Sequence, residues 1–245
     1  MANRIIVVRH EITPDNVRGE VQGDSDPPLR PQRGSPKRIY DLTDKLAREI
    51  GPSSEIYVFS SESRRAYDTG EGIHDRLWAQ WGRMSHVHYT PDLRERGQGV
   101  LERKNYAQVL AMLQREQISD PDEARKAVLS ILYELDDILG QVPKSEMGEK
   151  LERVVGEFER TDGVVIAVGH LVSGLNYLVN LMTTGDIMGN PRQPFLDYPN
   201  LHAIVLDRGT SGKYIKTKSY DPSLNSPTGN GTQQNSDTTL AKSGR

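Results

Sequence analysis

The sequence predicts an α/β protein, a three-layer α/β/α sandwich with a mostly parallel central sheet and a helical lid insertion. Four short, apolar runs rich in β-branched residues occur at 4–8, 55–60, 164–168 and 203–206. Segments with helical spacing of apolar residues lie between these runs. The runs at 4–8 and 164–168 are almost continuously apolar, which is typical of strands that helices cover on both faces.

The helices are predicted from apolar side chains three and four positions apart. In the segment 36–50 these are Ile39, Leu42, Leu46 and Ile50. The other predicted helices span 64–81, 106–116, 121–139, 146–160 and 172–182. Residues 86–89 form a weaker predicted strand, and the alternation at 214–218 indicates an edge strand.

One domain is expected over residues 1–220. The block from about 105 to 140 has helical patterns and no strand, so it interrupts the strand–helix alternation as an inserted lid. Residues 221–245 are polar, with Leu224, Leu240 and Ala241 as the apolar exceptions. Such a segment buries too little surface to offset its ordering entropy, so we expect a disordered tail.

Composition narrows the classes of function. The 245 residues include 31 Lys and Arg against 34 Asp and Glu, a net charge of −3, which argues against nucleic-acid binding driven by overall charge. The absence of cysteine excludes disulfides, thiolate zinc sites and a cysteine nucleophile. No apolar run reaches membrane-spanning length, and the N-terminal run is short for a signal peptide. We expect a cytoplasmic protein with no nucleic-acid or membrane partner.

Chemistry-bearing residues follow the predicted strands at the point where each strand ends. His10 follows the first strand, Ser61 with Arg64 and Arg65 follows the second, and His170 follows the third. Ligands of open α/β sheets bind at these carboxyl ends. Arginine binds phosphate oxygens bidentately, and a neutral imidazole can attack phosphorus. Cationic neighbours lower the pKa of an imidazole, which favours the neutral nucleophile at pH 7.

Five landmarks in order resemble one known family. They are Arg9-His10-Glu11 with Thr13 and Asn16; Asp26-Pro27-Pro28-Leu29 with Gly34; Ser61, Arg65, Ala66 and Thr69; Leu93, Glu95 and Gly99; and the strand VVIAVG ending at His170. This order resembles the histidine phosphatase superfamily in its phosphoglycerate-mutase-like branch (branch 1), over residues 4 to about 181. The acid-phosphatase branch fits poorly, because RHEITP and His170-Leu171 replace its motifs.

The resemblance implies a two-step phosphoryl transfer without a metal or other cofactor. His10 is then the nucleophile, and Arg9, Arg65 and His170 hold the phosphoryl oxygens. Glu95 donates a proton to the leaving oxygen and then activates water. Glu102, in the same segment, is the rival acid.

Further substrate contacts are expected from Thr13, Asn16 and Leu171, beside or after the catalytic residues. Two positions depart from the family pattern. Arg103 stands where the family often has glycine, and with Lys104 it can bind a second anionic group.

Glu11 is the second departure, because it replaces the glycine after the nucleophile. A carboxylate pointing into a phosphate pocket is unfavourable. We therefore expect Glu11 to point away, to pair with an arginine such as Arg64, or to contact a cationic substrate.

These observations predict a metal-independent phosphomonoester hydrolase, a histidine phosphatase acting through a phosphohistidine on His10. Glu95 and His170 are 75 positions apart, and the Arg-Arg segment of the mutases is missing between them, which favours hydrolysis. The alternatives are a phosphoglycerate-type mutase and a non-catalytic phospho-ligand-binding module in which Glu11 prevents turnover. The substrate class stays open between a small phosphorylated metabolite and a phosphoprotein, and so does a homodimer.

Other histidines have simpler interpretations. His86 and His88 alternate on one strand face, but no third ligand lies nearby, so no metal site is expected. His202 is a weaker candidate for the pocket rim.

Overall fold

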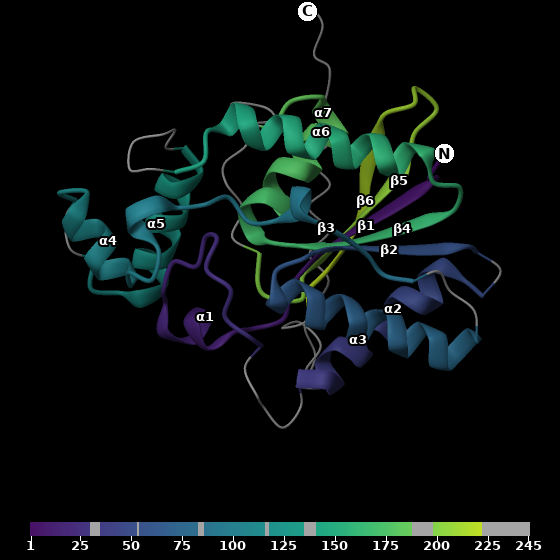
Figure 1. Cartoon of the computed structure of the whole chain (residues 1–245), viewed down its shortest axis with the longest axis horizontal. Helices are drawn as coiled ribbons and strands as arrows, with labels where there is room; N and C mark the ends of the chain where they lie inside the picture. Colours follow the sequence, from purple (N-terminus) through teal and green to yellow (C-terminus); the bar gives the residue numbers. More distant parts are fainter. Residues whose placement is uncertain are drawn as a thin grey trace, which may run out of the picture.

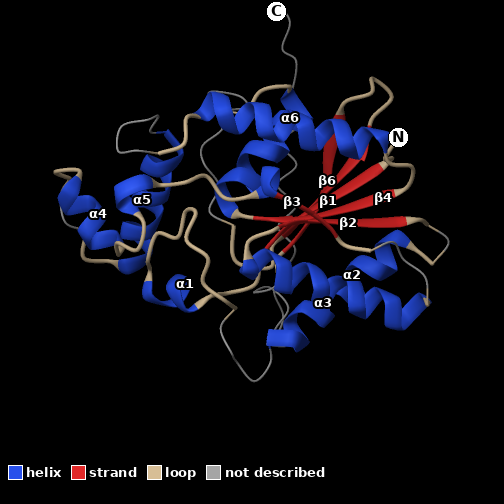
Figure 2. Cartoon of the chain, in the orientation of Figure 1, coloured by secondary structure: helices blue, strands red, loops and turns tan. Residues whose placement is uncertain are grey.

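A six-stranded sheet organises the chain in the computed structural model, which describes residues 1–29, 35–52, 54–82, 86–115, 118–134, 141–187 and 198–221. Its strand order is β3-β2-β4-β1-β5-β6 (Figures 1 and 2). The strands are β1 (Arg4–Arg9), β2 (Ile56–Ser61), β3 (His88–Thr90), β4 (Val164–Gly169), β5 (Ala203–Arg208) and β6 (Tyr214–Tyr220). The first four in spatial order, β3 to β1, are parallel, while β5 and β6 are antiparallel. The predicted α/β fold with a mostly parallel sheet is confirmed.

Helices cover both faces of the sheet (Figure 2). The α-helices are α1 (Pro14–Arg18), α2 (Ser35–Ile50), α3 (Arg64–Trp81), α4 (Tyr106–Met112), α5 (Pro121–Glu134), α6 (Lys144–Arg160) and α7 (Val179–Thr184). Two 3₁₀ turns, η1 (Pro91–Leu93) and η2 (Gly99–Leu101), and the π-helix η3 (Leu171–Leu178) complete the elements. In Figure 1, α2 and α3 lie on one face, and α6, η3 and α7 on the other.

Alternating side chains of β1 divide the core between the two faces, as the period of two in a strand requires. Ile5 and Val7 pack in the cluster that includes the buried faces of α6 and η3. Ile6 and Val8 pack in the cluster that includes α2 and α3. β1 is therefore buried on both sides, which explains its continuous apolar run.

The register of the parallel strands brings their carboxyl ends together. Arg9 of β1 lies opposite Gly169 of β4, so the next residues, His10 and His170, leave neighbouring strands at the same level. On the other side of β4, Ser60 of β2 pairs with Val168. Three strand ends thus deliver side chains to one place.

The α4–α5 pair stands beside the sandwich rather than on the sheet (Figure 1). Its apolar side chains form a separate small core with Val21 and Leu101, which includes Val109, Val128 and Leu132. The helical insertion expected from about 105 to 140 corresponds to this unit as far as residue 134. Residues 135–140 lie outside the described part of the chain.

Several boundaries differ from the prediction. The short helix α1 was not predicted, although Thr13 and Asn16 form a reciprocal capping box at its start. The helix expected at 172–182 divides into η3 and α7. Gly34 of the second landmark and tail residues 222–245 lie outside the described residues.

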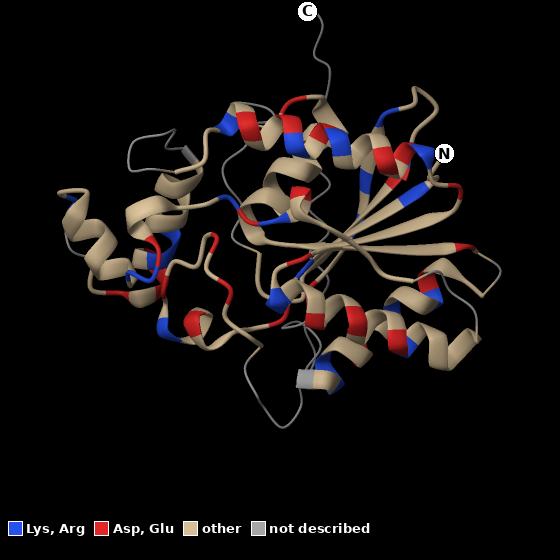
Figure 3. Ribbon diagram, in the orientation of Figure 1, with Lys and Arg blue, Asp and Glu red and all other residues tan. Residues whose placement is uncertain are grey.

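Charged side chains lie mainly on helices and loops, and the middle of the sheet is free of them (Figure 3). Among the described residues, no helix is long and apolar enough to cross a membrane.

Gly163, which precedes β4, gives a direct test of this architecture. Its φ is +139°, and an added Cβ would lie 2.5 Å from the carbonyl oxygen of Glu55. That oxygen already accepts the amide of Val164 at 2.9 Å, so it cannot move away freely. We expect Gly163→Ala to lower the free energy of unfolding by roughly 2–4 kcal/mol in urea denaturation.

The control is Gly156→Ala in α6, where the added Cβ meets nothing closer than 3.6 Å. It should be neutral or stabilising by up to about 1 kcal/mol, because alanine is the better helix former. Equal effects of the two substitutions would contradict the placement of β4 beside Glu55.

Candidate active site

His10 is the residue around which the site is built. Its backbone amide donates to Gly169 O at 2.9 Å, which continues the sheet pairing by one residue. Its Nδ1 lies 2.7 Å from the carbonyl oxygen of Glu11. Because a carbonyl only accepts, Nδ1 carries the proton and Nε2 keeps its lone pair. The backbone therefore selects the tautomer that a nucleophilic Nε2 requires.

His170 takes the opposite tautomer. Arg65 Nε, which can only donate, lies 3.3 Å from His170 Nδ1. His170 Nε2 then carries the proton and faces the hydroxyl oxygens of Ser61 and Ser63 at 3.0 and 3.1 Å. The centroids of the His10 and His170 rings are 5.2 Å apart.

Burial and positive charge keep both imidazoles neutral. Desolvation is the main cause that lowers the pKa of His10 well below its ordinary value, and the charges of Arg65 and Arg9 add to it. Desolvation is again the main cause that lowers the pKa of His170, followed by Arg65, His10, Arg9 and Arg94. An unprotonated His10 is the form that can attack phosphorus.

The two arginines are themselves anchored. Arg65 is buried and donates through its guanidinium to the carbonyl oxygens of Gly23, at 2.9 Å, and of Ser25. Arg9 is buried as well and donates to the carbonyl oxygen of Tyr198. These backbone acceptors hold the cations beside the histidines.

Glu95 reaches the site from the segment after η1. Its Oε1 accepts the amides of Arg96 and Ser173, both at 2.9 Å, and its Oε2 accepts the amide of Val172 at 3.2 Å. The rival acid Glu102 has a different place: its Oε1 accepts the amides of Asp24 and Gln98 at 2.8 and 2.9 Å. Glu102 therefore organises loops, while Glu95 sits at the start of η3.

A cavity of about 50 Å³ that opens to solvent lies between the strand ends and the α4–α5 unit. Its lining includes five of the predicted site residues: Arg9, His10, Asn16, Glu95 and Leu171. The rest of the lining is Glu20, Val21, Gln22, Gly23, Gln98, Tyr106, Arg125, Leu129, Leu132 and Val172. Arg65 and His170 are not among the lining residues, but the His170 ring lies beside that of His10 and Arg65 donates to it.

Two predicted substrate contacts are not among the described residues that line the cavity. Thr13 is buried and caps α1, where its hydroxyl accepts the amide of Asn16 at 3.2 Å. Arg103 is exposed at a left-handed turn with φ of 61°. His202 is also outside the lining; its Nε2 lies 2.6 Å from Ser219 Oγ, and burial lowers its pKa to about 4.

Glu11 points away from the cavity, as one of the expectations had it, but its partner is Arg38 of α2. The distance from Glu11 Oε1 to Arg38 Nη1 is 2.6 Å. Arg64, the partner suggested from the sequence, instead lies 3.9 Å from Asp68.

The sequence interpretation missed Arg125 and the apolar residues of α5 that line the cavity, Leu129 and Leu132. They belong to the insertion, whose position relative to the sheet no local pattern reveals. It also missed Ser63, which hydrogen-bonds to His170 together with Ser61. A second serine two positions after Ser61, at the end of a strand, was a signal that could have indicated it.

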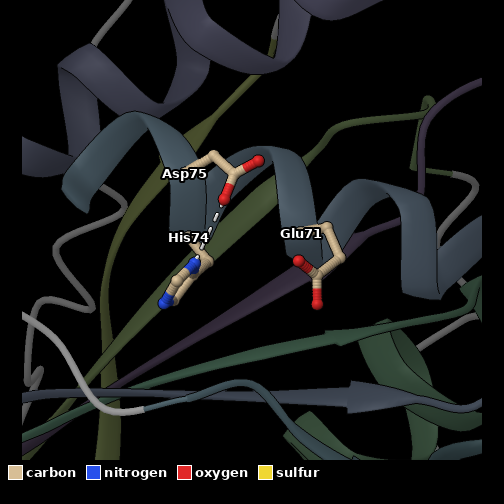
Figure 4. Close-up of side chains that lie close together, drawn as sticks. All are labelled: Glu71, His74 and Asp75. Atoms are coloured by element: carbon tan, nitrogen blue, oxygen red, sulfur yellow. Dashed lines mark hydrogen bonds and ion pairs between the residues drawn. The ribbon is translucent and has the colours of Figure 1, made fainter. Parts of the chain in front are cut away.

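One cluster has the donor types of a metal site (Figure 4). The ligand atoms of Glu71, His74 and Asp75 on α3 lie within 4.8 Å of one another. Glu71 accepts a hydrogen bond from Tyr89, and His74 lies 3.3 Å from Asp75. The cluster lies on α3 next to Tyr89 of β3 and shares no residue with the cavity, so it has no part in this site.

The comparison with known families agrees with this geometry. Residues 5–130, more than half of the chain, match the histidine phosphatase superfamily (branch 1). The chain belongs to this superfamily. The matched range contains Arg9, His10, Arg65 and Glu95. No curated protein matches the chain.

Several solved structures have a similar fold. One is a mycobacterial glucosyl-3-phosphoglycerate phosphatase, with 20% identity and a TM-score of 0.63 over 88% of this chain and 97% of that one. A phosphoglycerate mutase from Bacillus anthracis has 18% identity and a TM-score of 0.63, over 90% and 93% of the two chains. A phosphoserine phosphatase from Entamoeba histolytica has 15% identity and a TM-score of 0.59, over 91% and 98%. At these identities the likeness shows the fold.

The neutral histidines predict how stability depends on pH. Because burial lowers the pKa of His10 and His170, the unfolded chain binds more protons than the folded one below about pH 6.5. The free energy of unfolding therefore has its full value with respect to these histidines above that pH. It falls as the pH drops, by up to about 1.4 kcal/mol per pH unit for each histidine. We expect His10→Gln to make the unfolding free energy less dependent on pH between 7.5 and 5.5.

The control is His86→Gln, because His86 is exposed and this variant removes a histidine outside the active site. Identical pH dependence in wild type and His10→Gln would show that His10 is not held in its neutral form.

Proposed function

We propose that this histidine phosphatase superfamily member hydrolyses phosphomonoesters through a phosphohistidine at Nε2 of His10. The observation that carries the proposal is the fixed tautomer: Nδ1 donates to the backbone at Glu11, so the lone pair of Nε2 is free. A low pKa keeps that nitrogen unprotonated, and His10 lines a cavity that opens to solvent. A nucleophile of this kind divides the hydrolysis into two easier steps.

In the first step Nε2 of His10 attacks phosphorus in line, and the bond from phosphorus to the ester oxygen breaks. The leaving oxygen takes a proton from Glu95, which lines the same cavity. Arg9, Arg65 and His170 supply the positive charge and hydrogen-bond donors that stabilise the phosphoryl oxygens. Because two guanidinium groups supply this charge, the proposed reaction needs no metal ion.

In the second step water attacks phosphorus and gives a proton to Glu95. The N–P bond breaks, its electron pair returns to Nε2, and inorganic phosphate leaves. The cavity's opening to solvent supports access of water to the phosphohistidine.

The arrangement of Glu11 favours an enzyme over a phospho-ligand-binding module. A carboxylate beside the nucleophile would repel phosphate if it faced the cavity. Glu11 instead faces Arg38 and is absent from the described lining. The departure from the family glycine therefore leaves the phosphate pocket free of an added negative charge.

The cavity supports a small phosphorylated metabolite as the substrate. Leu129, Leu132, Leu171 and Val172 contribute apolar surface to the lining. An alcohol with an apolar portion would bury that portion against them. The proteins of similar fold include both phosphatases and a mutase. An assay can distinguish hydrolysis from transfer of the phosphoryl group to a second alcohol.

The test is release of inorganic phosphate from a panel of phosphomonoesters with a metal chelator present. We expect wild type to release phosphate and His10→Ala to lose at least about 10³-fold in kcat/KM. Transfer of phosphate to a second alcohol without release would favour the mutase. A folded wild type without either activity would contradict the proposal.

Glu95→Gln tests the proton donor separately. For alkyl phosphates we expect kcat/KM to fall by about 10²–10⁴-fold, and for p-nitrophenyl phosphate by roughly tenfold or less, because p-nitrophenolate leaves without a proton. Glu102→Gln is the matched control, since that carboxylate holds loop amides instead. Equal losses on both kinds of substrate would contradict the role of Glu95.

A further inference from the structure

Glu11 is an unusual neighbour for a phosphate-binding nucleophile, because it is a carboxylate with no exposed surface. Its Oε1 accepts Arg38 Nη1 and the amide of Ile12, both at 2.6 Å. Its Oε2 is buried and has no hydrogen-bond partner within the described ranges. Burial raises the pKa of Glu11, while the Ile12 amide and the charge of Arg38 lower it. Burying a carboxylate costs free energy, and the contacts with Ile12 and Arg38 offset part of that cost.

The backbone of Glu11 controls the nucleophile. Its carbonyl oxygen is the acceptor for His10 Nδ1 at 2.7 Å. Its amide donates to Thr69 Oγ1 at 3.0 Å, and that hydroxyl donates to the carbonyl oxygen of Arg65 at 2.7 Å. The peptides on both sides of the Glu11 Cα therefore take part in the active site.

The side chain of Glu11 ties this backbone to a different element. Arg38 belongs to α2, which packs against α3, the helix that carries Thr69 and Arg65. The link from α2 through Arg38 and Glu11 thus ends at the carbonyl that orients His10. Without Arg38, Glu11 Oε1 still accepts the Ile12 amide, but the side chain that makes this bond is no longer tied to α2, so less opposes rotation of the peptide between Glu11 and Ile12.

We propose that the Glu11–Arg38 ion pair positions the nucleophile: it holds the Glu11 carbonyl in the orientation that keeps His10 in the Nδ1-protonated tautomer with Nε2 aimed into the cavity. Glu11 and Arg38 act through His10 and are positioning residues that do not touch the substrate. This inference rests on the proposed function of His10. In-line attack is sensitive to such orientation, because displacements of about 1 Å can cost up to 10²-fold in rate.

The first test is the rate of phosphohistidine formation in a single turnover. Arg38→Met removes the cation from a side chain that is 40% exposed, and a thermal melt of the variant checks that it is folded. We expect a fall of about three- to tenfold in the phosphorylation rate at saturating substrate with KM within about twofold, and recovery of most of it in Arg38→Lys. Glu11→Ala should show the same pattern with a larger loss, and Glu11→Gln, which keeps an acceptor oxygen, a smaller one.

The matched control is Arg76→Met. Arg76 of α3 pairs with Asp44 of α2 at 2.7 Å and is 37% exposed, so it joins the same two helices without reaching His10. It should leave the phosphorylation rate within about twofold of wild type. Equal effects of Arg38→Met and Arg76→Met would overturn the inference, because they would indicate general helix docking.

The second test does not depend on activity. ¹⁵N NMR of the His10 ring reports which nitrogen carries the proton. We expect Nδ1–H in wild type and Arg76→Met, and a mixture of tautomers in Arg38→Met and Glu11→Ala. Unchanged tautomer and phosphorylation rate in folded Arg38→Met and Glu11→Ala would overturn the inference. A wild type that forms no phosphohistidine would contradict the proposed function instead, and the tautomer would still test the pair.

Discussion

The parallel pairing of β1 with β4 is the constraint on which the site depends. It sets Arg9 opposite Gly169, so that His10 and His170 leave two adjacent strands together. The pairing also buries β1 on both faces and removes the two imidazoles from water. A shift of register by one residue would separate the histidines and turn the apolar side chains of β1 to the wrong faces.

Burial then determines the chemistry of the site. Desolvation and two nearby guanidinium groups disfavour protonated imidazole, so both histidines stay neutral. Hydrogen bonds assign the tautomers in opposite senses: a carbonyl acceptor fixes Nδ1–H in His10, and an arginine donor fixes Nε2–H in His170. The same cationic surroundings that disfavour a proton favour a dianionic phosphoryl group. Nucleophile activation and phosphate binding therefore come from one arrangement of charge.

Much of this was predictable from local patterns, and the exceptions have physical reasons. Apolar runs identified the strands, and the strand ends identified His10, His170 and the pair Arg64 and Arg65, of which the family resemblance selected Arg65. Glu95 followed from the family resemblance. The position of the α4–α5 unit, and with it Arg125, depends on the small core around Val21 and Leu101, which no periodicity reveals. Glu11 does pair with an arginine, but with Arg38 rather than Arg64, the example named from the sequence, because the packing of α2 brings Arg38 to it.

The central claim is that Nε2 of His10 carries the phosphoryl group. The most direct measurement is to mix enzyme and phosphomonoester, quench in alkali within milliseconds, and locate the covalent phosphate by mass spectrometry and ³¹P NMR. We expect an acid-labile, alkali-stable phosphate on Nε2 of His10 that forms and decays fast enough to carry turnover. Phosphate release with no label on His10, or with the label on another residue, would contradict it.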